Sequence, residues 1–391
     1  MGGFTPQIPG IKIQDPILKK SFQREINEMI GRNNDSFPGS QPVSFATRHL
    51  EELRERDYFL CEKTDGVRCL LFLTNDFRDG QEVEVVYLVD RKNDFYWVPD
   101  VHIPTPRGHG TFYTRTLMDG ELVLDEQPDG IMYADGKTRR LHYLLFDCLV
   151  YDGKNMVERD LESRLGHMHT IFPPYKDFCH KFPEDVRNHT FLLKKKAVHM
   201  SYAFDDFFKS IIPQLKHGND GLIFTCVHSP YKPGTDDRLL KWKYPEENSV
   251  DFVLSLDIPD LESQDRPSNS HSSPPPEKDY DVIPRLILYV AEGSNHYRYW
   301  ADLYVTSDDW DKMREWAEQN HKGLDESIVE CVMDSEKRWR FLRFREDKKD
   351  GNFINTVNSV IESIEDPVNK QDLLNAANGI RHAWKERHAT R

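Results

Sequence analysis

The sequence predicts an α+β protein of two domains, the first of them built mainly on antiparallel sheet. The chain has 391 residues, and a domain typically takes about 150. Short apolar runs bounded by Asp, Gly, Asn or Pro recur between residues 58 and 242, which is the pattern of strands. Few helical crossovers separate these runs, and this favours antiparallel over parallel pairing.

The composition is that of a globular protein with a substantial core. It is 38% hydrophobic and 30% charged, and the longest apolar run, residues 286–291, is far shorter than the roughly 18 residues of a membrane span. The first residues match neither a secretory signal nor a myristoylation motif, so we expect no membrane partner. The six cysteines form no CxxC pair, which predicts reduced thiols in the cytosol or nucleus.

The net charge bears on which nucleic-acid-binding classes the protein can belong to. The formal net charge of −14 disfavours a protein that coats nucleic acid through bulk charge. It leaves room for a local basic cleft, and residues 337–349 carry seven Lys or Arg against two acids.

The predicted elements of the first domain begin with a helix. Asp15 fits its N-cap, Pro16 its first position and Gly31 the position after its end. A second helix is predicted over residues 205–215, where apolar side chains share one face. Buried strands are predicted at residues 69–73, 83–89, 121–124, 143–149 and 222–225. Residues 130–138 resemble a phosphate-binding loop, but five residues separate their glycines and a strand follows, so we interpret them as a hairpin turn.

A change in composition marks the second domain. Residues 263–276 are rich in Ser and Pro, which is typical of a flexible insertion. Strands are predicted at residues 285–291, 297–306, 327–333 and 339–344, with a helix capped by Ser307 among them. About five short strands and a helix fit a small barrel such as an OB fold. The end of the chain returns to helix, with Asp366 and Pro367 as an N-cap and first-turn pair.

These elements predict the domain boundaries. We expect a first domain over residues 1–244 and a barrel over residues 245–354, with its flexible insertion at about 260–280. Helices over about 355–391 follow, and the sequence leaves open whether they pack back on the first domain.

The stretch from Glu62 to Arg68 carries the most chemical information. Lys63 lies at the edge of an apolar segment, where desolvation and neighbouring cations lower the pKa of a lysine and make its amine nucleophilic. Gly66 allows a tight turn, so that Arg68 can reach the same pocket. Taken alone, a surface loop of mixed charge is an equally good interpretation.

Similar clusters recur in order at the ends of the apolar runs. They are Asp90-Arg91, Asp119-Gly120-Glu121, Phe146-Asp147, Asp220-Gly221, Lys241-Trp242-Lys243 and Arg345-Glu346-Asp347-Lys348. Together they offer a nucleophilic amine, carboxylates for a hard divalent cation, cations for phosphate oxygens and an aromatic ring to cover a base. This set predicts nucleotidyl transfer through a lysine phosphoramidate.

The ordered set resembles the motifs of the covalent nucleotidyltransferases, which comprise mRNA capping guanylyltransferases and ATP-dependent polynucleotide ligases. In detail it is similar to the fungal mRNA guanylyltransferases, from about residue 37 to residue 357. The resemblance implies an antiparallel, ATP-grasp-like nucleotidyltransferase domain, an OB-fold barrel and a cleft between them. It also implies transfer of GMP from GTP, through a covalent lysyl-GMP intermediate, to the 5′-diphosphate end of nascent pre-mRNA.

The resemblance implies roles for residues of the first half of the chain. Lys63 would attack the α-phosphorus of GTP, while Arg68 and Arg91 would contact the ribose. Glu121 would face the sugar or the metal. Phe146 would stack on guanine, although a strand residue of this kind is more commonly part of a core.

Further roles follow for the second half. Asp220 would hold Mg²⁺ or Mn²⁺, and Lys241 and Lys243 would neutralise the α-phosphate. Lys196 would lie near guanine, although Lys194 to Lys196 can equally well be interpreted as a solvated run of charges. In the second domain three residues would act on the β- and γ-phosphates, namely Arg345, Asp347 and Lys348.

The resemblance also implies partners and a location. The substrates would be GTP and 5′-diphosphate RNA, and the location would be the nucleus. The phosphorylated C-terminal domain of RNA polymerase II and a separate RNA 5′-triphosphatase subunit would be partners. Two alternatives stay open: an ATP-dependent DNA or RNA ligase that uses the same lysyl chemistry, and an inactive module that binds RNA or phosphopeptides. Trp242 and Trp339 beside the last motifs favour capping.

Overall fold

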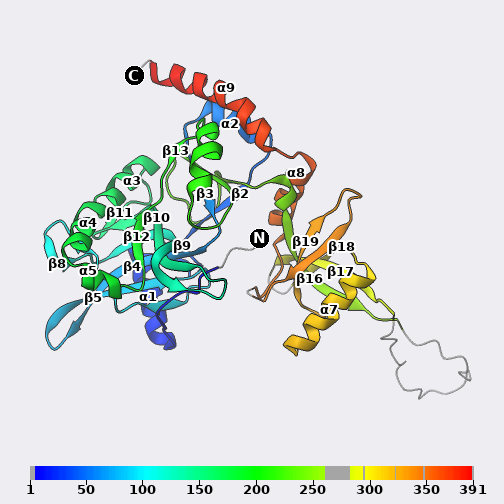
Figure 1. Cartoon of the computed structure of the whole chain (residues 1–391), viewed down its shortest axis with the longest axis horizontal. Coiled ribbons are helices and arrows are strands. Elements are labelled where there is room, and N and C mark those ends of the chain that lie inside the picture. The colour runs from blue at the N-terminus through cyan, green and yellow to red at the C-terminus, as the bar shows by residue number, and fades with distance from the viewer. Residues whose placement is uncertain (1–4, 260–281, 294–295, 322, 347, 390–391) are drawn as a thin grey trace, which may run out of the picture. The chain divides into compact units, whose positions relative to one another are not determined.

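The computed structural model of the chain describes residues 5–259, 282–293, 296–321, 323–346 and 348–389 (Figure 1). The chain divides into two compact units, the first formed by Met1–Lys243 with Asn369–Arg391 and the second by Tyr244–Val368. The predicted flexible insertion lies outside the described residues. Within the described ranges, every helix is too short or too polar to cross a membrane.

The larger sheet of the first unit has the strand order β1-β6-β5-β4-β9-β10-β11, and β12 also pairs with β10. Its pairs are antiparallel except for β10 with β12. The strands are β1 (Ile11–Lys12), β4 (Val67–Arg78), β5 (Gln81–Val89), β6 (Phe95–Trp97), β9 (Thr116–Met132), β10 (Thr138–Tyr151), β11 (Lys154–Asn155) and β12 (Leu192–Lys195).

The second sheet has the order β13-β3-β14-β15-β2. Among these described strands, only β15 and β2 run parallel. The strands are β2 (Ser40–Ser44), β3 (Tyr58–Thr64), β13 (His199–Met200), β14 (Asn219–Cys226) and β15 (Gly234–Trp242). A separate ribbon pairs β7 (Pro104–Thr105) with β8 (Gly108–Phe112). The prediction of mainly antiparallel sheet in an α+β fold is confirmed.

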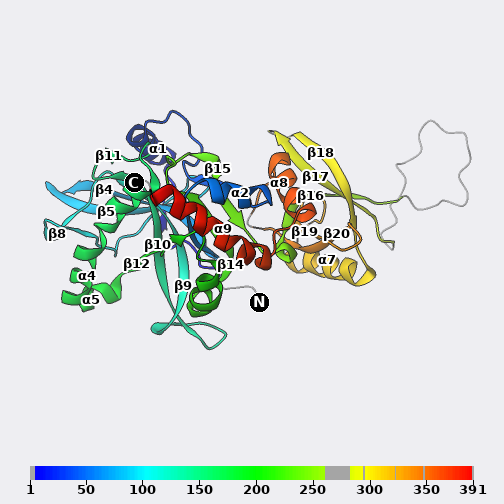
Figure 2. The ribbon, with the colours of Figure 1, turned by 90° about the horizontal axis from the view of Figure 1, so that it is seen from above.

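The central strands of the larger sheet are buried on both faces over most of their length, which explains the nearly continuous apolar runs in them. In β4, Cys69 and Leu71 belong to one core cluster, whereas Leu70 and Phe72 belong to another. The helix α1 (Pro16–Ile30) contributes to the second cluster, and α3 (Leu161–His169) and α4 (Phe172–Lys181) contribute to the first. Figures 1 and 2 show α1 on one side of this sheet and α3 and α4 on the other.

The first helix follows its predicted caps. The Asp15 side chain accepts hydrogen bonds from the backbone N–H groups of Ile17 and Leu18, and Gly31 ends the helix with φ at 70°. The sequence did not predict α2 (Arg48–Glu55), α3, α4 or α5 (Pro183–Asn188). These helices span at most ten residues each, so that their apolar stripes are too short to stand out.

The prediction of one continuous α-helix over residues 205–215 is wrong. The segment consists of α6 (Phe204–Asp206), the π-helical turn η1 (Phe207–Ile211) and the 3-10 turn η2 (Ile212–Gln214). Pro213 has no N–H group to continue an α-helical ladder. The hairpin predicted near residues 130–138 is confirmed, because β9 and β10 pair and Tyr133 N–H donates to the Lys137 carbonyl at 2.9 Å.

The second unit is a closed barrel with the strand order β16-β17-β18-β20-β19. Its strands are β16 (Ser249–Asp257), β17 (Arg285–Gly293), β18 (His296–Tyr304), β19 (Ile328–Met333) and β20 (Trp339–Phe344). The short turn η3 (Pro245–Glu247) precedes the barrel, α7 (Ser307–Asn320) joins β18 to β19, and α8 (Ile354–Glu365) follows β20. The barrel core contains Phe252, Leu288, Val329 and Trp339.

Two predicted caps are wrong. The N-cap of α7 is Thr306, one residue before Ser307, because Thr306 has extended backbone and forms a capping box with Asp309. Asp366 follows the end of α8, and the next helix, α9 (Lys370–Ala389), begins three residues beyond Pro367. The Asn369 side chain accepts the first N–H bonds there.

The last two helices belong to different units. The helix α8 lies in the second unit, whereas α9 lies in the first, where it packs beside α2 (Figure 2). An ion pair of 2.7 Å between Arg387 and the buried Asp57 fixes the end of α9 on this unit.

Candidate active site

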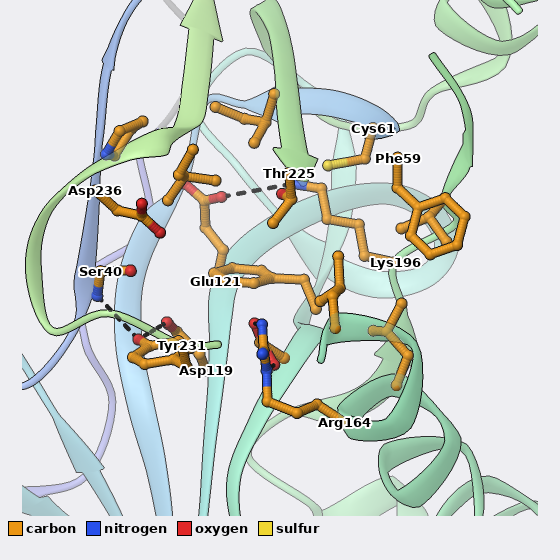
Figure 3. Close-up of a pocket in the computed structure, with 18 of the residues that line it drawn as sticks. Ser40, Phe59, Cys61, Asp119, Glu121, Arg164, Lys196, Thr225, Tyr231 and Asp236 are labelled. Carbon is orange, nitrogen blue, oxygen red and sulfur yellow. Dashed lines mark hydrogen bonds and ion pairs between the residues drawn. The ribbon is translucent and has the colours of Figure 1, made fainter. Parts of the chain in front are cut away.

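A pocket in the first unit gathers side chains from both sheets (Figure 3). It is lined by Lys63 from β3, Arg68 from β4, Glu121 from β9 and Phe146 from β10. Six of the sequence-predicted residues line it, namely Lys63, Arg68, Arg91, Glu121, Phe146 and Lys196. The sheets therefore bring together residues that lie up to 133 positions apart, from 63 to 196.

Lys63 lies near the end of β3 with its side chain 23% exposed. Burial lowers the pKa of the Lys63 amine, and the nearby Lys243 lowers it further. Asp220 acts in the opposite direction without cancelling the shift. A lysine with a lowered pKa loses its proton more easily and is then a nucleophile.

Asp220 holds the Lys63 amine and a second lysine. Lys63 Nζ lies 2.6 Å from both Asp220 carboxylate oxygens, and Lys243 Nζ lies 3.0 Å from one of them. These two lysines lower the pKa of the Asp220 carboxyl, although its burial opposes them. Gly221 follows with φ at 139°, and a Cβ there would lie 2.0 Å from the Trp242 carbonyl oxygen. The close approach of β14 and β15 therefore requires glycine after Asp220.

Lys241 lies on β15, and its side chain does not line the pocket. It lies opposite Ile223 of β14, which does line the pocket, and Lys243 follows two positions later, just beyond the end of β15. The Lys241 backbone carbonyl accepts a hydrogen bond from Phe45 N–H at 2.9 Å, which fixes the edge of the sheet at this point.

Arg68 is fixed by a network of buried groups. Its guanidinium donates to both carboxylate oxygens of Asp119, at 2.9 and 2.5 Å, and to the Ser40 carbonyl oxygen. Tyr231 donates to Asp119 at 2.5 Å and accepts a hydrogen bond from Ser40 N–H at 2.9 Å. Figure 3 shows these two bonds as dashed lines. Burial of Arg91 and its proximity to Arg68 lower the pKa of the Arg91 guanidinium.

Phe146 occupies an irregular position in β10. The register between β10 and β9 shifts between Leu145 and Asp147, and this β-bulge directs the intervening Phe146 ring into the pocket. The Arg68 guanidinium and Lys196 Nζ each lie 5.6 Å from the centre of the ring. Arg164, a buried residue of α3, holds Asp147 through bonds of 2.7 and 3.0 Å.

Lys196 is a buried cation of the pocket and is not part of a solvated run. Only 3% of its side chain is exposed, and its Nζ donates to Thr64 at 2.5 Å. Glu121 and Glu62 lie 3.8 and 4.0 Å away. Burial opposes the charge of Lys196, but these acids and Cys61 raise its pKa above the usual value. Burial also raises the pKa of Glu121.

The barrel residues of the last motif are held within the second unit. Arg345 Nη1 lies 3.0 Å from the buried Asp251 carboxylate and 3.5 Å from Glu330. Lys348 Nζ also donates to Asp251. Asp347 lies outside the described residues. One buried carboxylate therefore positions two of the predicted phosphate-binding cations next to each other.

Several pocket residues were not predicted from the sequence. The sequence pattern assigns no role to Asp119 beyond its place in the cluster with Gly120 and Glu121, although it lies two positions before Glu121 and thus on the same face of β9. Tyr231 and Arg164 come from a loop and a helix, and carry no local pattern that connects them to a strand end. Asp236, a buried acid of β15, also lines the pocket.

The residues present fit a hard divalent cation that is completed by substrate oxygens. The described ranges contain no group of three or more His, Cys, Asp or Glu side chains able to hold a metal by themselves. Asp220 and Glu121 nevertheless offer carboxylate oxygens, and Mg²⁺ in phosphoryl-transfer sites is commonly bound by one or two carboxylates together with phosphates. The donor set thus fits Mg²⁺ or Mn²⁺ better than a softer metal.

Comparison with known proteins shows which family the chain resembles along its length. Residues 5–245 match the family model for the mRNA capping enzyme catalytic domain, and residues 247–374 match the model for its C-terminal domain. The chain is 41% identical over 389 residues to the mRNA-capping enzyme subunit alpha of Neurospora crassa, covering 97% of this chain and 93% of that protein. It is 42% identical over 369 residues to the subunit of the same name from Schizosaccharomyces pombe, covering 94% and 86%.

Among solved structures, a mycobacterial DNA ligase D complexed with ATP and MES aligns with a TM-score of 0.37 and 14% identity, over 80% of this chain and 95% of that one. The family matches run through both units of the chain. These matches confirm the prediction, made from the ordered motifs, that the chain is a guanylyltransferase of mRNA capping. They do not support the alternative of a ligase. This chain therefore belongs to the mRNA capping enzyme family.

Proposed function

We propose that this chain is an mRNA guanylyltransferase that transfers GMP from GTP to the 5′-diphosphate end of nascent RNA through a covalent bond to Lys63 Nζ. The observation that carries the proposal is the position of this amine. It lines the pocket, its pKa is lowered by burial, and it contacts a carboxylate that also binds Lys243. A neutral amine next to cations is suited to attack an anionic phosphate.

The first half of the reaction forms the enzyme–nucleotide bond. Lys63 Nζ gives up one proton to solvent and attacks the α-phosphorus of GTP with its lone pair. The bond from the α-phosphorus to the oxygen that bridges to the β-phosphate breaks, and pyrophosphate leaves with that electron pair. In the second half, a terminal phosphate oxygen of the RNA attacks the same phosphorus. The P–N bond breaks, and the Lys63 amine is restored with the GpppN cap as product.

The pocket would bind the nucleoside through groups already in place. Phe146 offers the face of its ring to guanine, and Lys196 Nζ lies near that ring as a donor for a carbonyl oxygen. Arg68, held by Asp119, and Arg91 would contact the ribose. Side chains that are already held in place before the substrate arrives lose little conformational entropy when they bind it. This lowers the entropy cost of reaching the reactive geometry.

The α-phosphate would lie beside Lys63, where Lys243 would neutralise its oxygens, and we extend this role to Lys241 from the motif alone. Asp220 and Glu121 would hold the divalent cation. That cation, when bound, would act as a Lewis acid that stabilises negative charge on the phosphate oxygens. Phosphoryl transfer depends mostly on positioning and charge neutralisation, and these lysines supply both.

For the second unit we propose an OB fold that supplies cations to the β- and γ-phosphates. A closed barrel of five strands, with a helix between the third and fourth, supports the fold. Arg345 and Lys348 would bind the leaving pyrophosphate, and their pairing with the same Asp251 supports a joint role. We extend this role to Asp347 from the motif alone.

We further propose that the chain works in the nucleus with protein partners. The relatives in Neurospora crassa and Schizosaccharomyces pombe are named as alpha subunits, and this supports a second subunit, for which an RNA 5′-triphosphatase is the candidate. The phosphorylated C-terminal domain of RNA polymerase II is the candidate partner that would bring the enzyme to nascent transcripts. Co-purification of the chain with each candidate tests these two associations.

The proposal is tested by incubating the chain with α-labelled GTP or α-labelled ATP and a divalent cation. A guanylyltransferase retains label from GTP after denaturation and passes it to 5′-diphosphate RNA as a cap. Label retained from ATP alone would identify a ligase. RNA binding without any retained label would identify the inactive binding module.

A further inference from the structure

Asp236 is a buried carboxylate at the pocket that the mechanism above does not use. It lies on β15 opposite Pro42 of β2, at the point where the register of these two strands breaks. Asp236, Pro42 and Ser40 all line the pocket, and Asp236 is only 7% exposed. In the view of Figure 3, Asp236 and Ser40 lie on one side of the pocket and Lys196 lies on the other.

Asp236 differs from the other acids of the pocket in its partners. Asp119 lies 2.5 Å from Arg68, Asp147 lies 2.7 Å from Arg164, and Glu121 lies 3.8 Å from Lys196. For Asp236, the described part of the chain supplies one hydrogen bond, from Arg238 N–H at 3.0 Å, and no cation within ion-pair distance. Burial raises the pKa of the Asp236 carboxyl.

A buried carboxylate without a cation destabilises a fold unless a donor reaches it. The second carboxylate oxygen of Asp236 therefore needs a hydrogen-bond donor, and the described residues do not supply one. The triphosphate of GTP offers only acceptor oxygens and is strongly negative, so that a carboxylate repels it. The nucleoside carries suitable donors: guanine N1–H, the 2-amino group and the two ribose hydroxyls.

We propose that Asp236 binds the nucleoside half of GTP by accepting a hydrogen bond from the N–H edge of guanine or from a ribose hydroxyl. This inference rests on the proposed function, since it needs GTP in the pocket. It assigns a substrate-binding role to a strand residue that lies five positions before Lys241 and outside every cluster recognised in the sequence.

The test compares Asp236→Ala and Asp236→Asn with the matched controls Asp237→Ala and Asp237→Asn. Asp237 is the next residue in the chain, and 82% of its side chain is exposed. The GTP concentration that half-saturates adduct formation should rise roughly 10- to 100-fold in Asp236→Ala. It should rise about 10-fold in Asp236→Asn, because a neutral amide oxygen accepts a weaker hydrogen bond. The controls should match wild type, and equal half-saturation in Asp236 and Asp237 variants would overturn the inference.

Analogues of GTP identify the donor. Inosine triphosphate lacks the 2-amino group, and 2′-deoxy and 3′-deoxy GTP each lack one hydroxyl. The analogue that lacks the true donor should bind wild type more weakly than GTP does, and Asp236→Ala, which has no acceptor, should no longer distinguish it from GTP. If half-saturation of Asp236→Ala requires more GTP than wild type, and this variant discriminates against all three analogues as wild type does, the donor is guanine N1–H.

Two further measurements separate a binding role from a structural one. Without GTP, Asp236→Asn should unfold at the same temperature as wild type or a higher one, because an unpaired buried charge has been removed. With GTP, its thermal stabilisation should be smaller than that of wild type. Joint loss of stability and GTP affinity would indicate a structural role and overturn the inference. Absence of adduct in wild type would instead overturn the proposed function.

Discussion

Lys63 Nζ lies 2.6 Å from both carboxylate oxygens of Asp220, and the same carboxylate lies 3.0 Å from Lys243 Nζ. One negative charge thus faces two ammonium groups. Asp220 favours the protonated form of Lys63, whereas burial and Lys243 disfavour it, and the lowered pKa shows that the second pair of effects is the larger. The arrangement positions the amine while keeping its proton easy to remove.

The first prediction concerns the pH dependence of adduct formation. Because only the neutral amine attacks, the rate should rise with pH through a midpoint below 10.5, the ordinary pKa of lysine. Lys243→Ala removes a positive charge that lowers this pKa, so that the midpoint should move to higher pH even as the overall rate falls. Initial rates of labelled adduct formation over a pH series give the midpoint. An unchanged or lower midpoint in Lys243→Ala, with Lys209→Ala as the exposed control, would contradict the argument.

The second prediction concerns the ion pair behind Phe146. Arg164 and Asp147 have side chains only 1% and 8% exposed, so Arg164→Ala leaves a buried carboxylate without its cation. We expect a loss of about 3 to 5 kcal/mol in the free energy of unfolding, measured with chemical denaturant. The loss should shrink as the pH falls, because burial already raises the pKa of Asp147 and protonation removes the unpaired charge.

The matched control is Arg187→Ala. Arg187 pairs with Glu184 at 2.9 Å, but both side chains are about three-quarters exposed, at 74% and 76%. Such pairs contribute little, and a change within about 0.5 kcal/mol is expected. An Arg164→Ala protein as stable as this control would contradict the prediction that the buried ion pair stabilises the fold.

The third prediction concerns the choice of base. Lys196 Nζ can donate to the carbonyl oxygen of guanine, whereas adenine presents an amino donor at the same position. Lys196→Met should therefore lower the preference for GTP over ATP in adduct formation, by roughly 10-fold or more. Lys195→Met, which alters the exposed neighbour at the end of β12, should keep the wild-type preference. An unchanged preference in Lys196→Met would remove Lys196 from the guanine contact.

The fourth prediction separates the two halves of the reaction. If Lys348 binds pyrophosphate, Lys348→Ala should slow adduct formation at least about 10-fold. Transfer of GMP from an isolated adduct to 5′-diphosphate RNA should keep its wild-type rate, because no pyrophosphate takes part in that step. Lys349→Ala, an exposed neighbour, serves as the control. Equal slowing of both halves would instead indicate a role in RNA transfer or in folding.

The sequence predicted the parts of the site that lie at strand ends. Lys63 and Asp220 each lie at the end of an apolar run. Their strands, β3 and β14, are antiparallel neighbours in one sheet, and the register of this pair brings the two residues together. Lys243 follows β15, the next strand along that sheet. Charged residues at strand ends are predictable from the sequence because they depend only on the local pattern of apolar and charged positions.

Other parts depend on tertiary register and were not predictable. The Phe146 ring reaches the pocket because a bulge shifts β10 against β9, and no local pattern indicates a bulge there. Tyr231 fixes Asp119 across 112 positions of sequence, which no periodicity encodes. The pattern around Lys196 is equally compatible with a solvated run for the same reason, since the acids that pair with this lysine lie on β3 and β9, outside its own segment.

The central claim is that Lys63 Nζ carries the GMP. The most direct measurement is to form the adduct with α-labelled GTP, digest the protein and locate the modified residue by mass spectrometry, with Lys63→Arg in parallel. The account predicts one GMP on Lys63 through an acid-labile P–N bond, and no retained label in Lys63→Arg. A GMP found on another residue, or equal labelling of the variant, would contradict it.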